Sequence, residues 1–546
     1  MADFAPPPLG RDQLVLFPEK LDQAISADHP VRLLDAILNR LDWSKWEATY
    51  VLVCGQPPIH PKVIAGAILY GIQKGIRSSR ALEESLTVRS DFRWLAQGRS
   101  LDHTTISKFR VKNSLLIQDL YVQIGLVARE LGYLSLDTLG FDGTRLRASN
   151  RRSGTRTPEQ LVEAKKELAA KFDELNALMA KADEDDAKQF GNASTTRLNK
   201  ELIDVQNRVA RVDAALAEIK RLEEKQQKVP ARLPITDPQS RVMPNKEGGF
   251  APNYTPTATV DIASGLIVTA GVMAATDEDK HMIPAMTEVM KSFSLEAPPA
   301  RLLADGMMST GENIAACESL GIDFYSPIKL GAGPDNPAIR EDLSKPVAED
   351  DVGRLPTTTT KHRDGTKTTQ FNKNAFVYDE SKNCYWCPAG KALHQKDVTR
   401  ETENGRTRVR IRFLADPSDC ASCPLKAQCK KASTRSRMVN REQHENKRLA
   451  HAAKMSLEES KQIYATRRHA GERPFATIKS QFGARHFLTR GLAKVRCEWN
   501  WLVSAFNIHR LMNILVGAVG PPLEAPLSTV ALSPTAIPQT PKTRSA

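Results

Sequence analysis

The chain has 546 residues, and its 77 lysines and arginines outnumber its 64 aspartates and glutamates, which gives a formal net charge of +13. At roughly 150 residues per domain, this length exceeds a single core and predicts three or four units. The basic balance favours a polyanionic partner, with nucleic acid the first candidate. No window approaches about 18 uncharged apolar residues, and residues 1–10 lack a basic segment followed by an apolar one, so we expect a cytoplasmic protein without a membrane span.

After a flexible start over residues 1–28, helical spacing of apolar residues runs through residues 29–132 and predicts an all-α domain. Within it, a short helix that Asp102 can cap carries Lys108 and Arg110 outward. Such a helix suits a DNA groove or a phosphate backbone, as in a helix-turn-helix domain. A solvated face on an ordinary helical bundle fits the same pattern, so both interpretations stay open.

The next segment, residues 133–156, contains a candidate core strand with an acid inside it. Leu139 and Phe141 give the strand its apolar character, whereas Asp142 has no apolar reason to be there. Asp-Gly between apolar runs is a hairpin-turn signal, so one interpretation of Asp142-Gly143 is a turn. The other interpretation is that Asp142 binds a metal ion together with further carboxylates.

Residues 157–229 predict two long helices with heptad seams, an insertion that Pro230 closes. A polar break over residues 182–195 allows them to fold back as an antiparallel coiled-coil hairpin, although a coiled coil between two chains fits equally well. The seams are formed by Leu161, Leu168, Phe172, Leu175 and Met179, and by Leu202, Val205, Val209, Val212, Leu216 and Ile219.

Strands return in residues 230–330, which continue the core. Residues 254–261 and 266–274 predict a hairpin, and the apolar run 300–304 ends at Asp305, just before a predicted helix over 309–321. Open α/β sheets commonly place their chemistry where a strand hands over to a helix. Asp305 is therefore the second candidate carboxylate.

A cysteine cluster marks residues 331–440 as a small β-rich insertion. It contains Cys384, Cys387, Cys420, Cys423 and Cys429. Pairs two residues apart on tight turns suit a tetrahedral zinc site, and five sulfurs compete for four places. We expect Cys387, Cys420, Cys423 and Cys429 to bind a structural Zn²⁺ and Cys384 to be spare. Reduced cysteines without a metal are the alternative.

The third candidate carboxylate lies in residues 441–517, ahead of an apolar closing helix and a predicted disordered tail over 518–546. Glu472 follows Arg468 by four residues and precedes Lys479 by seven, offsets that share one helix face. Pro474 predicts a bend or a new helix. A solvated face of charged side chains is the alternative, and it would be preferred if this segment stood alone.

Together these motifs resemble the DDE transposases of bacterial insertion sequences. The resemblance rests on Asp142-Gly143-Thr144, on Asp305-Gly306 and on the late Tyr-Arg-Glu-Lys pattern, and it extends to residues 30–113 and to the cysteine insertion. The family's signature uses one arginine for Tyr-x2-Arg and for Arg-x3-Glu. In this chain Arg467 satisfies the first spacing and Arg468 the second.

The resemblance implies an α/β ribonuclease-H-like core whose Asp142, Asp305 and Glu472 bind two Mg²⁺ (or Mn²⁺) ions. Paired ions of this kind support hydrolysis of DNA at the element's ends and attack of the freed 3′ hydroxyl on target DNA. The resemblance also implies a bacterial, nucleoid-associated protein that forms a homodimer or higher oligomer at synapsis. We expect five side chains to contact DNA: Arg467, Arg468, Lys479, Lys108 and Arg110. The alternatives are a catalytically inactive, zinc-containing DNA-binding protein and a nuclease without strand transfer.

Overall fold

The computed structural model describes residues 20–50, 58–150, 154–186, 195–225, 227–245, 248–275, 277–328, 335–361, 365–403 and 406–518. The predicted flexible start up to residue 19, the middle of the predicted helix break at 187–194, and the predicted tail from residue 519 lie outside the described residues. The chain divides into two compact units, one of which combines the part through Tyr133 with Ala476–Gly483 and the chain from Asn500 onward. In the described part, no helix has the length and apolar character that crossing a membrane requires.

Helices build the first unit around an aromatic core. Two of them, α1 and α3, begin with His-Pro, and the rings of His29 and His60 accept the N–H of the second helical residue. Proline suits this position because its missing N–H would have no helical partner there. Trp46 stacks on Phe109 with ring centroids 5.3 Å apart. The helices are α1 (Pro30–Leu38), α2 (Ser44–Glu47), α3 (Pro61–Gln73), α4 (Ser79–Val88), α5 (Ser90–Leu95), α6 (His103–Lys112) and α7 (Ser114–Glu130).

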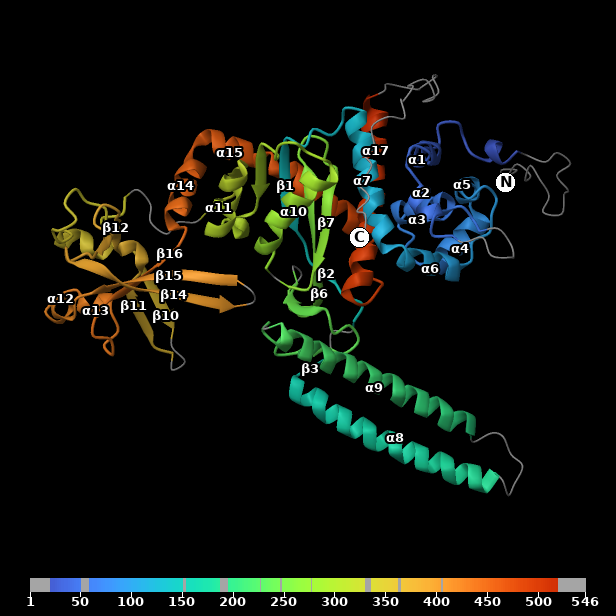
Figure 1. The fold of residues 1–546 in the computed structure, drawn as a ribbon, viewed down its shortest axis with the longest axis horizontal. Coiled ribbons are helices and arrows are strands. Elements are labelled where there is room, and N and C mark those ends of the chain that lie inside the picture. The colour runs from blue at the N-terminus through green and yellow to red at the C-terminus, as the bar shows by residue number, and fades with distance from the viewer. Residues whose placement is uncertain are drawn as a thin grey trace, which may run out of the picture. The chain divides into compact units, whose positions relative to one another are not determined.

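A mixed sheet organises the second unit, with its strands in the order β7-β6-β1-β8-β9 (Figure 1). Strand β6 is antiparallel to both β1 and β7, whereas β8 is parallel to both β1 and β9. This topology is consistent with the expected ribonuclease-H-like core. The strands and the helices that follow them are β1 (Thr138–Gly143), β2 (Leu146–Arg147), β5 (Arg241–Pro244), β6 (Phe250–Asp261), β7 (Ile267–Met273), α10 (Asp279–Ser292), β8 (Arg301–Ala304), α11 (Gly311–Leu320) and β9 (Asp323–Tyr325).

Two long helices, α8 (Pro158–Asp186) and α9 (Thr195–Glu224), lie side by side in the segment between β1 and β6 (Figure 1). At their base, β3 (Thr155–Arg156) pairs with β4 (Leu233–Pro234). A small apolar core joins the helices to this strand pair. Its buried residues are Leu161, Val212, Ala215, Ile219 and Leu233.

The cysteine-rich segment forms an antiparallel sheet with its own apolar core, built around Phe371, Tyr385 and Phe413. Beside the sheet lies the hairpin of β10 and β11. The elements are β10 (Thr357–Lys361), β11 (Lys367–Phe371), β12 (Val377–Asp379), β13 (Cys384–Trp386), β14 (Ala392–Glu403), β15 (Arg406–Ala415), α12 (Pro417–Ala421), α13 (Lys426–Cys429) and β16 (Met438–Glu442).

The last helices are α14 (Glu445–Ser456), α15 (Glu458–Ala465), α16 (Arg467–Ala476) and α17 (Leu492–Ala518). No new helix starts at Pro474: α16 runs through this proline and passes directly into a π-helical turn, Thr477–Gln481. Because Pro474 cannot donate a backbone hydrogen bond, a wider π turn nearby is a common local adjustment.

Candidate active site

Two of the predicted carboxylates follow paired positions on neighbouring parallel strands. Phe141 of β1 is in register with Ala304 of β8, and the residues that come next are Asp142 and Asp305. Neighbouring strands lie about 4.8 Å apart. The sheet therefore brings Asp142 and Asp305 to the same edge, although they are far apart in the sequence.

The hairpin-turn interpretation of Asp142-Gly143 is wrong. Both residues are part of β1 and pair with Ala258 and Thr257 of β6. Beyond them, Leu146 of β2 pairs with Tyr254, so the chain keeps its direction along β6. A glycine after Asp142 therefore needs another explanation.

Glu278 supplies that explanation, because its carboxylate packs directly against Gly143. A Cβ built on Gly143 would lie 2.4 Å from Oε2 of Glu278, so the Glu278 carboxylate would have to shift to make room for it. Glu278 is 8% exposed and immediately precedes α10. Glu278 was not among the residues predicted from the sequence. It lies in the run Asp277-Glu278-Asp279, and acidic residues are also common at the start of an ordinary helix, so the run does not single out Glu278.

Asp305 is held where β8 ends. Its Oδ1 accepts the N–H of Met307 at 2.9 Å, which begins the short 3₁₀ turn Gly306–Met308. Its backbone carbonyl accepts the hydroxyl of Ser326, one residue beyond β9. The turn thus holds the side chain of Asp305, and Ser326 holds its backbone.

Helix α16 approaches Asp142 at a glycine. A Cβ on Gly471 would lie 3.4 Å from Oδ2 of Asp142, so this turn of the helix lies close to the carboxylate. One turn earlier, an Nη atom of Arg467 lies 3.1 Å from the same Oδ2, and the two side chains are 15% and 14% exposed. Arg468 and Glu472 are exposed. Of the two candidate arginines, Arg467 is the one that contacts the candidate site.

The three acids do not close around one point. Among the described residues, no group of three or more histidine, cysteine, aspartate or glutamate side chains is placed to hold a metal ion. Asp142 and Asp305 share an edge, while Glu472 is exposed on α16, the helix whose Arg467 contacts Asp142. Carboxylate oxygens are nonetheless the donors that Mg²⁺ and Mn²⁺ favour. The three carboxylates are therefore chemically suited to these ions, although their described side chains do not converge on one point.

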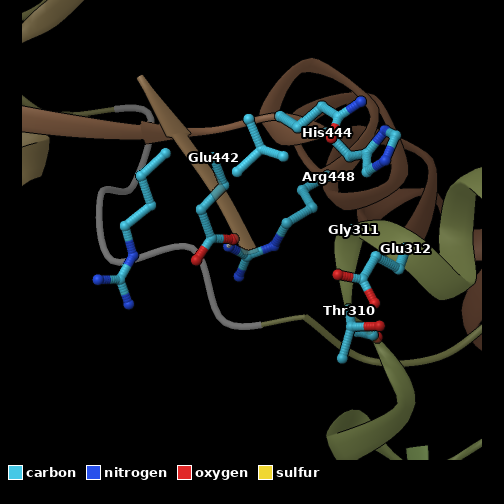
Figure 2. A pocket seen from close by; sticks show the side chains of 10 residues that line it. Thr310, Gly311, Glu312, Glu442, His444 and Arg448 are labelled. Atoms are coloured by element: carbon cyan, nitrogen blue, oxygen red, sulfur yellow. Dashed lines mark hydrogen bonds and ion pairs between the residues drawn. The ribbon is translucent and has the colours of Figure 1, made fainter. Parts of the chain in front are cut away.

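A pocket of about 270 Å³ begins four residues after Asp305 (Figure 2). The start of α11, from Thr310 to Glu312, forms one side, and Glu442, His444 and Arg448 form the other. A Cβ on Gly311 would lie 2.8 Å from Cβ of His444, so the backbone here must be glycine for α11 and α14 to approach this closely. The lining contains both acidic and basic side chains, so the pocket favours neither anionic nor cationic ligands.

The cysteines separate into one group of four and one apart. Burial raises the pKa of Cys429 to about 12, and the thiols of Cys387, Cys420 and Cys423 are close enough to contribute. Cys387 forms a tight turn, in which Lys391 donates its N–H to the sulfur at 3.3 Å and Gly390 has φ +73°. Cys384 is 2% exposed, and its pKa is raised by burial and by Asp379. As stated above, the described cysteines do not form a metal-binding group.

The remaining predicted DNA contacts lie in the first unit. Lys108 on α6 is exposed. Arg110 does not point outward as expected: it is half-buried, and its Nη1 donates to the carbonyl of Arg77 at 2.5 Å. This guanidinium ties two helical segments together, so Arg110 is a structural residue. Lys479, in the π turn, also belongs to the first unit.

Two protein families match this chain. Residues 19–112 match a family described as a transposase domain, and residues 386–512 match the family described as "Transposase DDE domain". The second match contains Glu472 and four of the five clustered cysteines but does not reach Asp142 or Asp305. No curated protein matches the chain. These two matches support a DDE-type transposase of the insertion-sequence kind.

Proposed function

We propose that this transposase hydrolyses the phosphodiester bond at the ends of its insertion sequence and then joins the freed 3′ hydroxyl to target DNA. The observation that carries the proposal is the position of Asp142 and Asp305 at the ends of adjacent parallel strands, with α16 in contact with Asp142. Two segments far apart in the sequence thus supply acids to one edge of the sheet, and a third contacts Asp142 through Arg467.

In this proposal Asp142, Asp305 and Glu472 hold two Mg²⁺ or Mn²⁺ ions. When bound, such ions activate the attacking oxygen and stabilise the leaving one in an in-line displacement. Arg467 orients the Asp142 carboxylate, and the exposed Arg468 is free to face a DNA phosphate. Glu472 completes the site when its exposed side chain turns toward Asp142.

The experiment that tests the proposal measures strand cleavage and strand transfer by the full chain on end-labelled DNA with Mg²⁺. Asp142→Asn and Asp305→Asn should each abolish both reactions while DNA binding persists. Asp137→Asn is the matched control, because Asp137 is exposed just before β1, at the opposite end of the strand. Cleavage by the Asp142→Asn protein would remove the assignment. Cleavage without joining by the natural chain would leave a nuclease, and binding without cleavage would leave an inactive DNA-binding protein.

The finer features of the proposal concern zinc and assembly. We propose that the thiols of Cys387, Cys420, Cys423 and Cys429 converge on one structural Zn²⁺. Their spacing and their mutual proximity support this, whereas Cys384 lies within the sheet at β13. We also propose a dimer or higher oligomer when two DNA ends are brought together, because each end requires a catalytic site.

A further inference from the structure

A second cationic feature lies in the second unit, outside the acidic edge. It is a cavity of about 750 Å³ beyond the end of β2. Arg147 of β2, Arg211 of α9 and Arg490 from the segment before α17 line it together with His486. No aspartate or glutamate occurs among the described residues of its lining. Three guanidinium groups around one cavity create a positive potential that attracts anions.

The acid nearest in sequence to this lining is already engaged. Asp237 follows Thr236 of the lining and is 1% exposed. Its Oδ1 accepts the hydroxyl of Tyr254 at 2.8 Å and the N–H of Gly491 at 3.1 Å. Asp237 is therefore buried and is not part of the cavity lining, whose charge remains positive.

The backbone around the cavity is held in place. Phe487 donates its N–H to the carbonyl of Arg147 at 2.8 Å, and Nε of Arg490 donates to the carbonyl of Ser149 at 3.0 Å. Asn150 adds an independent observation. Both polar atoms of its side chain are shielded from solvent and have no hydrogen-bond partner in the described part of the chain. A buried amide without partners is unfavourable unless a ligand supplies them.

We infer that this cavity binds the phosphate backbone of the same DNA that reacts at Asp142, an inference that rests on the proposed function. The planar guanidinium forks of Arg147 and Arg211 match phosphate oxygens, and Asn150 supplies a further donor. Asp142 pairs with Ala258 of β6 and Arg147 pairs with Asn253, five residues further along that strand. Five residues span about 17 Å, which corresponds to about five base pairs of duplex.

The test measures how salt affects binding of the full chain to a fluorescent duplex from the end of its insertion sequence. Each lost phosphate contact lowers the slope of log affinity against log salt by about 0.9. Arg147→Gln combined with Arg211→Gln should lower the slope by about 2 and the affinity at least tenfold. Among the described residues, neither side chain has a hydrogen bond or ion pair whose loss would disturb the fold. The matched control is Arg301→Gln, an exposed arginine at the start of β8.

A second measurement locates the contact. Single methylphosphonate substitutions remove one phosphate charge at a time, and those about five base pairs from the cleaved bond should weaken binding to the natural chain but not to the double variant. An unchanged salt slope in the double variant, or interference confined to other positions, would overturn the inference. Because binding is read without cleavage, a natural chain that binds DNA but does not cleave it would refute the proposed function. A reduced salt slope in the double variant would still show that the cavity binds DNA phosphates.

Discussion

The guanidinium group of Arg467 lies 3.1 Å from the carboxylate of Asp142, and both side chains are largely shielded from water. An ion pair in this setting is screened less than one on the surface. The pair connects the first turn of α16 to the end of β1 and thereby fixes the helix that carries Glu472 against the sheet. Arg467 is thus a positioning residue, which acts through Asp142.

Replacing Arg467 with alanine should abolish or strongly reduce strand cleavage and also destabilise the protein. The loss of a partly buried, hydrogen-bonded charge lowers the free energy of unfolding by about 1–3 kcal/mol. Arg467→Lys keeps the charge but not the planar fork and should recover part of the stability. Chemical denaturation and cleavage assays on the same preparations measure both effects.

Arg468→Ala is the matched control for this prediction, because the neighbouring side chain is exposed. It should change the free energy of unfolding by less than about 0.5 kcal/mol and weaken DNA binding instead. Equal destabilisation by the two alanine substitutions would show that the Arg467–Asp142 pair does not hold α16 in place.

Gly143→Ala should remove activity by displacing Glu278. The new Cβ would lie 2.4 Å from Oε2 of Glu278, so the carboxylate, the strand or both must shift. Overpacking of this kind lowers the free energy of unfolding by about 1–3 kcal/mol. Combining Gly143→Ala with Glu278→Ala should restore stability, which a double-mutant cycle measures.

Gly353→Ala provides the comparison, since a Cβ at Gly353 meets nothing within 4 Å. It should cause no loss of stability. If Gly143→Ala were equally harmless, the close packing of Glu278 beside Asp142 would be refuted.

The apolar pattern was sufficient to predict the elements that carry the site. The strands around Asp142 and before Asp305, the hairpin of β6 and β7, and the helix from Thr310 to Gly321 follow from alternation, caps and turn residues. These are local properties, so a single sequence expresses them directly.

What the sequence did not reveal depends on contacts between distant segments. Nothing near Gly143 indicates that Glu278 will pack on it, and nothing near Arg110 indicates that its guanidinium will bind the carbonyl of Arg77. Likewise, the choice between Arg467 and Arg468 depends on which helix face meets β1. The new helix considered at Pro474 does not form, because α16 continues through this proline into a π turn.

Asp237→Asn should raise the melting temperature, and the gain should grow with pH. Burial raises the pKa of Asp237 above its ordinary value, although hydrogen bonds from Tyr254 and Gly491 and the charges of Arg490 and Arg241 act in the opposite direction. The folded protein therefore holds this proton more tightly than the unfolded chain, and stability falls as pH rises from about 4 through the raised pKa. Asparagine keeps the acceptor and avoids the buried charge. Thermal unfolding from pH 3 to pH 8, which begins below the ordinary pKa of about 3.9, measures the difference.

Tyr254→Phe tests whether the hydrogen bond from Tyr254 stabilises the charged carboxylate of Asp237. It removes the hydroxyl that donates to Asp237 but retains the ring, which packs edge-on against Phe487. The variant should melt below the natural protein, and the difference should be larger at pH 8 than at pH 5. A gain from Asp237→Asn that is constant across this range would mean that the folded protein does not bury the charge.

Removal of zinc should destabilise the cysteine-rich sheet, which packs against Cys387, Cys420 and Cys429. Four thiolates around Zn²⁺ form a closed shell that contributes directly to folding. We expect about one zinc per chain by elemental analysis, and Cys423→Ser should lower both the zinc content and the melting temperature.

Cys384→Ser is the matched control, because Cys384 lies in β13 with Asp379 and Lys382 as its charged neighbours. After chelation, addition of Mg²⁺ alone should restore strand cleavage only if the cysteine-rich sheet stays folded without zinc. This comparison separates the role of zinc in folding from the role of Mg²⁺ in cleavage. Zinc content unchanged by Cys423→Ser would instead identify these residues as ordinary reduced cysteines.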